Sequence, residues 1–287
     1  MPTVTRRAAV LGHPIAHSLS PTLHTAAYQA LGLEGWQYTA VDTTTETLRD
    51  VLDDLDLGWA GLSLTMPLKQ TVIPMLDDVD PVASATGAVN TVVVRPSSCG
   101  IALGGYNTDV QGLVAALTEG LRGREVARAV VLGAGATAAS AVAALAQLGC
   151  ASPRVLARSI ARTAGLQEAA RRLGATPRFE VLDAVSALGP LRHADVVIST
   201  LPAHAADPVA GILLERAGSV PGVLLDVVYD PRPTALARAW GERGGVVVGG
   251  ERMLLHQAAE QVRLMTGRPA PVAAMDAALG AVLGVTR

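Results

Sequence analysis

The feature that most constrains the fold of this 287-residue chain is a repeated alternation of short apolar runs with longer amphipathic ones. Short runs rich in Val, Ile and Leu predict strands, and apolar residues at helical spacing predict helices. Such alternation is typical of α/β proteins with largely parallel sheets. We expect strands at 8–11, 37–41, 61–65, 89–94, 101–103, 129–132, 154–157, 178–182, 195–200, 223–228 and 246–248. Outside the segment from 129 to 248, we expect helices at 21–31, 46–55, 67–76, 110–121, 251–265 and 271–282.

The length and rhythm of the chain predict two domains. A chain of this size can hold two domains of about 100–150 residues, each with its own core. From residue 129 the alternation becomes regular, with helices between most strands, and indicates a doubly wound nucleotide-binding domain. The uncharged window 129–153 is long enough to cross a bilayer. Its Ala, Gly, Ser and Thr content and its Gly-rich turn indicate a buried strand and helix instead.

Charge and cysteine usage limit the classes of partner. The net charge is −2, both signs are interspersed, and no basic run suggests nucleic acid or an anionic membrane. Cys99 and Cys150 have neither metal-site spacing nor a disulfide framework, which fits a reducing cytoplasm. The N-terminal segment has too few apolar residues for a secretory signal. We therefore expect a cytoplasmic protein without a nucleic-acid or membrane partner.

A glycine-rich turn marks a cofactor site. Gly133, Ala134, Gly135, Ala136 and Thr137 follow an apolar strand and open an apolar helix. This is the context of the dinucleotide fingerprint, in which small residues let the backbone approach a pyrophosphate at a helix N-terminus. An ordinary strand-to-helix turn is the alternative, and the flanking strand and helix favour the cofactor.

The end of the next strand indicates which dinucleotide is bound. An NAD site usually has Asp or Glu about 20 residues after the turn, to bind the ribose 2′-hydroxyl. Here Arg158 stands 25 residues after Gly133 (158 − 133), followed by Ser159, with Arg162 close behind. Guanidinium groups and a hydroxyl suit a 2′-phosphate, so we expect NADP. The alternative is a pair of surface arginines.

Lys69 lies where helix physics disfavours a cation. Pro67 favours the first position of a helix, which puts Lys69 in the first turn, where the macrodipole repels positive charge by about 0.3–1 kcal/mol. A local rule broken without compensation tends to mark a functional site. Asp109, ahead of another helical pattern, supplies a carboxylate, although it also fits a simple N-terminal helix role. We expect this pair to do acid–base chemistry.

Two more segments carry candidate ligand contacts. Ser20 reads as an N-cap before Pro21, whereas Ser18 has no such explanation; in an extended segment both hydroxyls would face one polar ligand. Asn90 opens an apolar strand, where a turn role and a ligand-directed amide are about equally supported. His13, His17 and His24 lack companion ligands, so no metal site is expected.

Taken together, the motifs resemble the shikimate dehydrogenase family. The resemblance covers nearly the whole chain in the family's order. It rests on Ser18-Leu-Ser20, Thr65 and Lys69 in 61–69, Gly87-Ala-Val-Asn90-Thr91, Asn107-Thr-Asp109, Gly133-Ala-Gly135, Arg158-Ser159, Asp226-Val-Val-Tyr229 and Gly250-Glu-Arg-Met253-Leu254 with Gln257. Departures are Thr25, Ala136, Ala157 and Met265, and those at Ala136 and Ala157 bear on cofactor affinity rather than on the chemistry.

The resemblance implies reversible NADPH-dependent reduction of 3-dehydroshikimate to shikimate, a step of chorismate and aromatic amino-acid biosynthesis. It implies that Lys69 and Asp109 are catalytic and that the substrate is held by Ser18, Ser20, Thr65, Asn90, Tyr229 and Gln257. Val227 and Gly250 join the cofactor residues. It also implies a discontinuous substrate domain, 1–109 with 250–287, with a mainly parallel sheet, around a Rossmann-type NADP domain, 110–249.

Three alternatives remain open at this point. An NAD-using quinate/shikimate dehydrogenase has the same fold, although Arg158 and Ser20 disfavour it. An aminoshikimate-type paralogue shares the motifs. A non-catalytic NADP-binding sensor would keep the fold, but the presence of both Lys69 and Asp109 disfavours it. The chain is expected to act as a monomer or homodimer.

Overall fold

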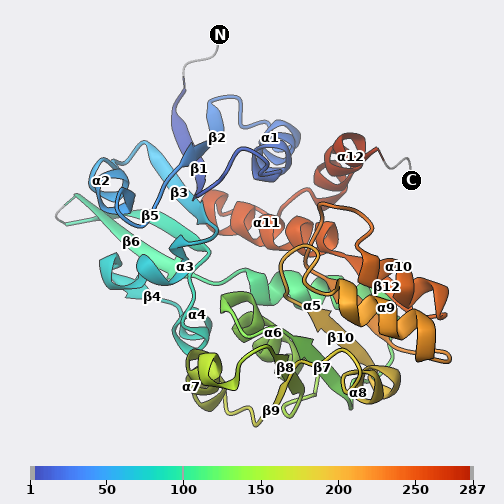
Figure 1. The fold of residues 1–287 in the computed structure, drawn as a ribbon. Helices are drawn as coiled ribbons and strands as arrows, with labels where there is room; N and C mark the ends of the chain where they lie inside the picture. Colours follow the sequence, from blue (N-terminus) through green and yellow to red (C-terminus); the bar gives the residue numbers. More distant parts are fainter. Residues whose placement is uncertain (1–3, 99, 285–287) are drawn as a thin grey trace. The chain divides into compact units, whose positions relative to one another are not determined.

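The computed structural model describes residues 4–98 and 100–284. Contacts divide the chain into two compact units, Met1–Thr108 with Leu254–Arg287, and Asp109–Met253. Each unit contains one sheet with helices packed on it (Figure 1). We call them the first and second unit and describe each by itself.

The described residues of the first unit form a sheet of six strands in the order β2-β1-β3-β5-β6-β4. β1, β2 and β3 are parallel, β4 is parallel to β6, and β5 is antiparallel to both β3 and β6. The strands are β1 (Arg6–Gly12), β2 (Trp36–Asp42), β3 (Trp59–Leu64), β4 (Asp78–Val79), β5 (Thr91–Ser97) and β6 (Gly100–Tyr106). The sheet is therefore mainly parallel, and β5 and β6 pair as an antiparallel hairpin. Cys99 lies outside the described residues.

The core of the first unit has two layers because strand side chains alternate between faces. Ala8 and Val10 of β1 pack with the layer of α1 (Ser20–Ala30), α11 (Gly250–Thr266) and α12 (Val272–Leu283). Ala9 and Leu11 pack with the opposite layer, which includes α2 (Leu48–Asp53) and α3 (Leu68–Thr71). A one-turn 3-10 helix, η1 (Ile73–Met75), and α4 (Pro81–Thr86) complete this unit, and neither α4 nor β4 was expected from the sequence.

In the second unit the described strands form an entirely parallel six-stranded sheet in the order β12-β11-β10-β7-β8-β9. Numbered within this unit, the order is 3-2-1-4-5-6, the doubly wound dinucleotide-binding topology. The strands are β7 (Ala129–Leu132), β8 (Arg154–Ala157), β9 (Arg178–Val181), β10 (Val196–Ser199), β11 (Val223–Asp226) and β12 (Val246–Gly249). The expected α/β fold with a doubly wound sheet is confirmed.

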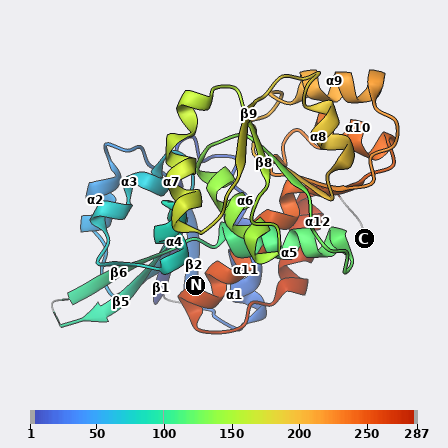
Figure 2. The same cartoon turned by 90° about the horizontal axis from the view of Figure 1, so that it is seen from below.

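Helices cover both faces of this sheet. α5 (Asp109–Leu121), α6 (Ala136–Gln147) and α7 (Ala164–Arg172) pack side by side, and a short 3-10 helix, η2 (Ile160–Thr163), precedes α7. α8 (Leu188–His193), α9 (Asp207–Arg216) and α10 (Ala235–Glu242) lie together in Figure 2. They contribute to one buried cluster that includes the fully buried Trp240. The window 129–153 is strand β7 followed by α6, as expected, and none of the described helices is long and apolar enough to span a membrane.

Candidate active site

The glycine-rich turn joins β7 to α6 at the carboxyl end of the sheet, where doubly wound folds bind ligands. Gly133 has φ +108°, and an added Cβ would collide with the Thr200 hydroxyl, so glycine is required there. Gly135 has φ −87° and a Cβ would meet no atom within 4 Å. The protein itself therefore does not need glycine at 135; the residue leaves open space at the N-terminus of α6.

That open space faces unpaired backbone donors. No carbonyl within α6 is available to the amides of Ala136 and Thr137, because the first helical amides have no intrahelical acceptor. Ala134, Ala136 and Thr137 are half-buried, so their side chains leave the turn accessible. The turn fits an anionic group such as a pyrophosphate.

Arg158 and Ser159 follow β8, the strand next to β7, and Arg162 lies in η2. Both arginines are exposed, and among the described residues no carboxylate pairs with either guanidinium. Ser159 is half-buried, and its carbonyl accepts a hydrogen bond from the Arg162 amide at 3.2 Å. The donors suit a phosphate ester, and no acidic residue of this strand end would repel it.

Val227 and Gly250 lie against each other in the second unit, since a Cβ at Gly250 would overlap the Val227 carbonyl. Asp226, at the end of β11, holds the following loop: it accepts hydrogen bonds from Thr234 Oγ1 at 2.7 Å and the Val228 amide at 3.3 Å. Tyr229 is half-buried in this loop, and burial, with the Asp230 carboxylate, raises the pKa of its hydroxyl. Sequence reasoning gave Asp226 no role of its own.

In the first unit, backbone hydrogen bonds join the segments that carry Thr65, Lys69 and Asn90. The Lys69 carbonyl accepts from the Val89 amide at 2.8 Å, and the Asn90 carbonyl accepts from the Leu64 amide at 2.7 Å. Thr65 and Lys69 are both half-buried. The side chains of Thr65, Lys69 and Asn90 therefore extend from hydrogen-bonded backbone segments at the end of β3.

One premise about Lys69 was wrong. The expected helix 67–76 is two short pieces, α3 and η1, and Pro67 precedes α3. Pro74 has no amide hydrogen to donate to the Gln70 carbonyl, so a continuous helix cannot form. A four-residue helix has one turn and little macrodipole, and Lys69 lies in its first and last turn alike. The helix macrodipole therefore does not single out Lys69. The position of Lys69 near Asn90 rests on the hydrogen bond between the Val89 amide and the Lys69 carbonyl instead.

The expected roles of the two serines are also corrected. The segment before α1 is a turn, not an extended strand, and Ser20 is the first residue of the helix with no side-chain cap. The Ser18 hydroxyl instead accepts a hydrogen bond from the Ser20 amide at 3.3 Å. Ser18 is half-buried and Ser20 buried. The helix begins one residue earlier than expected, so Leu19 is the N-cap residue and Ser20 does not cap the helix.

Asn90 is the centre of a buried polar cluster. Its Oδ1 accepts from Thr91 Oγ1 and from the Thr108 amide, both at 2.8 Å. Its Nδ2 donates to Thr108 Oγ1 at 3.0 Å and to Gln257 Oε1 at 3.4 Å. Asn90 is 2% exposed, so the amide is neither a turn residue nor a solvated one. Asp109 follows Thr108 directly as the first residue of α5 and belongs to the second unit.

Gln261 lies one helical turn beyond Gln257 and was missed by sequence reasoning. Its Nε2 donates to the Asn90 carbonyl at 3.2 Å and to Thr91 Oγ1 at 3.0 Å. Its Oε1 accepts from Ser63 Oγ at 2.9 Å and contacts His24 Nε2 at 3.3 Å. A backbone carbonyl can only accept, so the orientation of the Gln261 amide is fixed. The i, i+4 spacing of two glutamines was the available signal.

His24 completes this network as a neutral donor. With Gln261 Oε1 as acceptor, its Nε2 carries the proton, and its ring stacks on Tyr38 with centroids 3.9 Å apart. Burial lowers the pKa of His24 from 6.5 to about 3. Tyr38 in turn donates to Ser63 Oγ at 2.6 Å. His24 is thus a satisfied core residue, and no group of described His, Cys, Asp or Glu residues is arranged to hold a metal ion.

Comparisons with known proteins agree with this geometry. Residues 10–92 match the model described as "Shikimate dehydrogenase substrate binding domain", and residues 250–279 match "Shikimate 5'-dehydrogenase C-terminal domain". The chain is 38% identical to the shikimate dehydrogenase (NADP(+)) of Moorella thermoacetica, over 97% of this chain and 94% of that protein.

Solved structures are similar over the full length. The shikimate dehydrogenase of Mycobacterium tuberculosis is 41% identical with a TM-score of 0.86, covering 96% of this chain and 99% of that one. The shikimate 5-dehydrogenase of Thermus thermophilus, solved in complex with NADP(H) and shikimate, is 34% identical with a TM-score of 0.78, covering 95% and 98%. The chain belongs to the shikimate dehydrogenase family.

Proposed function

We propose that the chain catalyses the reversible NADPH-dependent reduction of 3-dehydroshikimate to shikimate. The observation that carries the proposal is the division of the candidate residues between two kinds of chemistry. The second unit has an open glycine turn and unpaired guanidiniums, which suit a dinucleotide with a 2′-phosphate. The first unit has hydroxyl and amide groups joined through Asn90, which suit a polyhydroxylated acid.

The cofactor is assigned to Gly133, Ala134, Gly135, Ala136, Thr137, Arg158, Ser159, Arg162, Val227 and Gly250. The amides at the start of α6 would hold the pyrophosphate, and the groups after β8 would hold the 2′-phosphate. The Val227 carbonyl lies so close to Gly250 that no side chain fits at position 250. When bound, NADPH supplies the hydride.

The substrate is assigned to Ser18, Ser20, Thr65, Asn90, Tyr229 and Gln257. The bond from Asn90 to Gln257, at 3.4 Å, is longer than the bonds of the Asn90 amide to Thr91 and Thr108. We therefore expect a substrate hydroxyl to exchange for this bond, with Thr91 and Thr108 keeping the Asn90 amide oriented. Such a site rejects analogues that lack the hydroxyl, because its buried polar groups are then unpaired.

Lys69 and Asp109 are assigned the acid–base chemistry. Reduction of a ketone develops an alkoxide, which needs a proton donor and nearby positive charge. The Lys69 ammonium supplies both, and in the oxidation direction its neutral amine accepts the hydroxyl proton. Asp109 is assigned to orient the ammonium. The backbone next to it is anchored because the Thr108 amide donates a hydrogen bond to Asn90 Oδ1.

The domain roles follow from this division. We assign substrate binding to 1–109 with 250–287, and NADP binding to 110–249. We place the protein in the cytoplasm as a monomer or homodimer, with a small-molecule substrate and no nucleic-acid or membrane partner. Free Cys150 and the balanced surface charge support this placement.

The decisive experiment compares kcat/KM for shikimate and quinate with NADP and with NAD, followed by absorbance of the reduced cofactor. We expect shikimate with NADP to be preferred. Preference for quinate with NAD would identify the quinate/shikimate type. An amino-substituted shikimate is assayed as a third substrate, and a preference for it would identify the aminoshikimate type. No turnover with any pair, together with NADP binding, would identify a sensor and contradict the proposal.

A further inference from the structure

A cavity lies in the second unit, at the amino ends of the parallel strands. It measures about 460 Å³, within the range of small-molecule sites. It is lined by Ala127, Arg128, Ala129, Val130, Ser152, Arg154, Arg178, Gly189, Pro190, His193 and Ala194. None of these residues is assigned to the substrate or to NADP. The glycine turn follows the carboxyl end of β7, so the cavity is at the opposite edge of the sheet.

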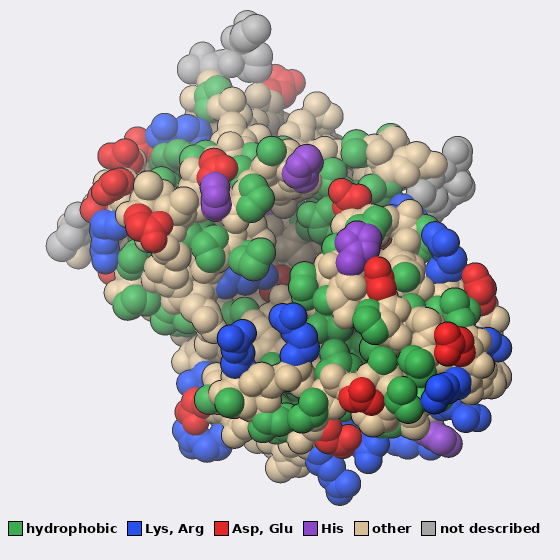
Figure 3. All heavy atoms as spheres, viewed as in Figure 1, with side chains coloured by type: hydrophobic (Ala, Val, Ile, Leu, Met, Phe, Trp, Pro, Cys, Tyr) green, Lys and Arg blue, Asp and Glu red, His purple; other side chains and the backbone are tan. Residues whose placement is uncertain are grey.

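Strand register places three arginines on one face of this edge. Arg154 of β8 pairs in register with Arg178 of β9 and with Val130 of β7. Side chains two residues apart point the same way, so Arg128 shares the face of Val130. Figure 3 shows basic side chains gathered along this lower edge of the second unit. Like charges directly opposite each other on neighbouring strands are destabilising, so the Arg154–Arg178 pair is unfavourable for stability. Unfavourable local features without compensation tend to occur at functional sites.

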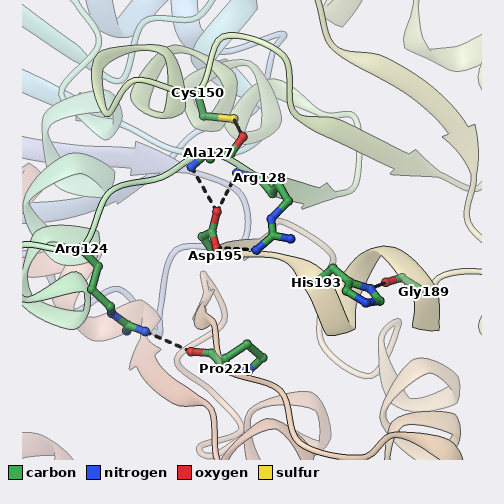
Figure 4. Close-up of polar contacts among 8 residues, drawn as sticks. All are labelled: Arg124, Ala127, Arg128, Cys150, Gly189, His193, Asp195 and Pro221. Carbon is green, nitrogen blue, oxygen red and sulfur yellow. Dashed lines mark hydrogen bonds and ion pairs between the residues drawn. The ribbon is translucent and has the colours of Figure 1, made fainter.

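The carboxylates here offset this charge only in part. Asp195 is fully engaged: Oδ2 accepts from the amides of Ala127 and Arg128 at 3.1 and 2.8 Å, and Oδ1 pairs with Arg128 at 3.2 Å (Figure 4). Glu180 pairs with Arg154 at 3.3 Å. Among the described residues, no carboxylate pairs with Arg178. Its guanidinium keeps all five donors for a ligand.

His193 closes the cavity on the side of α8. Its Nδ1 bonds the Gly189 carbonyl at 2.9 Å, and since that oxygen can only accept, Nδ1 carries a proton (Figure 4). In the neutral ring Nε2 then has a lone pair and no hydrogen, so it can accept a hydrogen bond from a ligand but cannot donate one. Apart from Ser152, the rest of the lining is apolar, and its accessible apolar side chains are Ala127 and Pro190. The cavity therefore combines anion-binding donors with an apolar wall.

We propose that this cavity binds a small organic phosphate, with the phosphate on Arg178 and Arg154 and the carbon skeleton against Ala127 and Pro190. Guanidinium groups bind phosphate bidentately, which favours a phosphate over a single-point anion. The ligand is distinct from NADP, since the cofactor residues lie at the other edge of the same sheet.

The test is calorimetric titration of phenyl phosphate and inorganic phosphate into the full-length protein saturated with NADP, which fills the cofactor site. We expect both to bind, phenyl phosphate more tightly because of the apolar wall. Arg178→Ser should weaken binding at least about tenfold, and Arg178→Lys less, because it keeps the charge but loses the fork. The matched control is Arg171→Ser, an exposed arginine of α7 paired with Glu168, which should bind as the wild type does.

Amide NMR shifts locate the ligand in the same titration. We expect shifts at 128–130, 152–154 and 189–194 and none at 133–137. Three results would overturn the proposal: no binding to the NADP-saturated protein, equal binding by Arg178→Ser and the wild type, or shifts confined to the glycine turn. Citrate binding as tightly as phenyl phosphate would overturn the assignment to a phosphate.

Discussion

Replacing Gln261 by leucine removes the amide that joins four buried partners. Two donors, Ser63 Oγ and His24 Nε2, then lose their acceptor, while the Asn90 carbonyl keeps its bond from the Leu64 amide. Each buried donor left unpaired costs about 1–3 kcal/mol, and the leucine regains part of this through apolar burial. We expect the first unit to lose about 2–4 kcal/mol of stability.

Hydrogen exchange followed by mass spectrometry measures this loss unit by unit. Amides of β3 and α11 in Gln261→Leu should exchange faster, by about tenfold for each 1.4 kcal/mol of stability lost, while those of β10 in the second unit should not change. Glu260→Gln is the matched control on the same helix, because it removes only a half-exposed ion pair with Arg263. Wild-type protection of β3 in Gln261→Leu would refute the network.

Three further predictions concern separate features. Burial lowers the pKa of His24 from 6.5 to about 3, so between these two values only the unfolded state binds this proton, and stability falls as pH falls. Measured by urea unfolding, the free energy of unfolding of the wild type relative to that of His24→Gln should fall by about 2 kcal/mol between about pH 7 and pH 5. A difference that does not change with pH would contradict this. Arg158→Asp should weaken NADPH far more than NADH, by a charge-assisted contact of about 1.5–3 kcal/mol, and an unchanged preference in steady-state kinetics would show that the 2′-phosphate is bound elsewhere. Gly135→Ala should fold normally, because its Cβ meets no atom within 4 Å, yet bind NADP more weakly in a fluorescence titration; wild-type affinity would place the pyrophosphate away from this turn.

Local patterns predicted the second unit well. The β7–turn–α6 context and the position of Arg158 after β8 each depend on a few consecutive residues. The break of the helix at Pro74 was also readable in principle, since proline removes an amide donor, but Pro67 and the apolar spacing around it outweighed that signal.

The buried network was beyond sequence reasoning because its partners are distant in the chain. Gln261 and Ser63 are 198 residues apart, and Gln261 and Thr91 are 170 apart. No local periodicity reports which face of α11 meets which strand of the first unit. Ser20 was expected to be the N-cap, but the helix starts one residue earlier, and a shift of one residue is below the precision of propensity arguments.

Proton transfer by Lys69 is tested most directly by the turnover number of Lys69→Ala with saturating shikimate and NADP. General acid–base catalysis contributes about 10²–10⁴-fold, so we expect a loss of that size while shikimate still binds by calorimetry. Lys69→Arg should fail as well, because a guanidinium does not release its proton near neutral pH. Full activity of Lys69→Ala, under conditions where a deuterium isotope effect shows that hydride transfer limits the rate, would contradict this role.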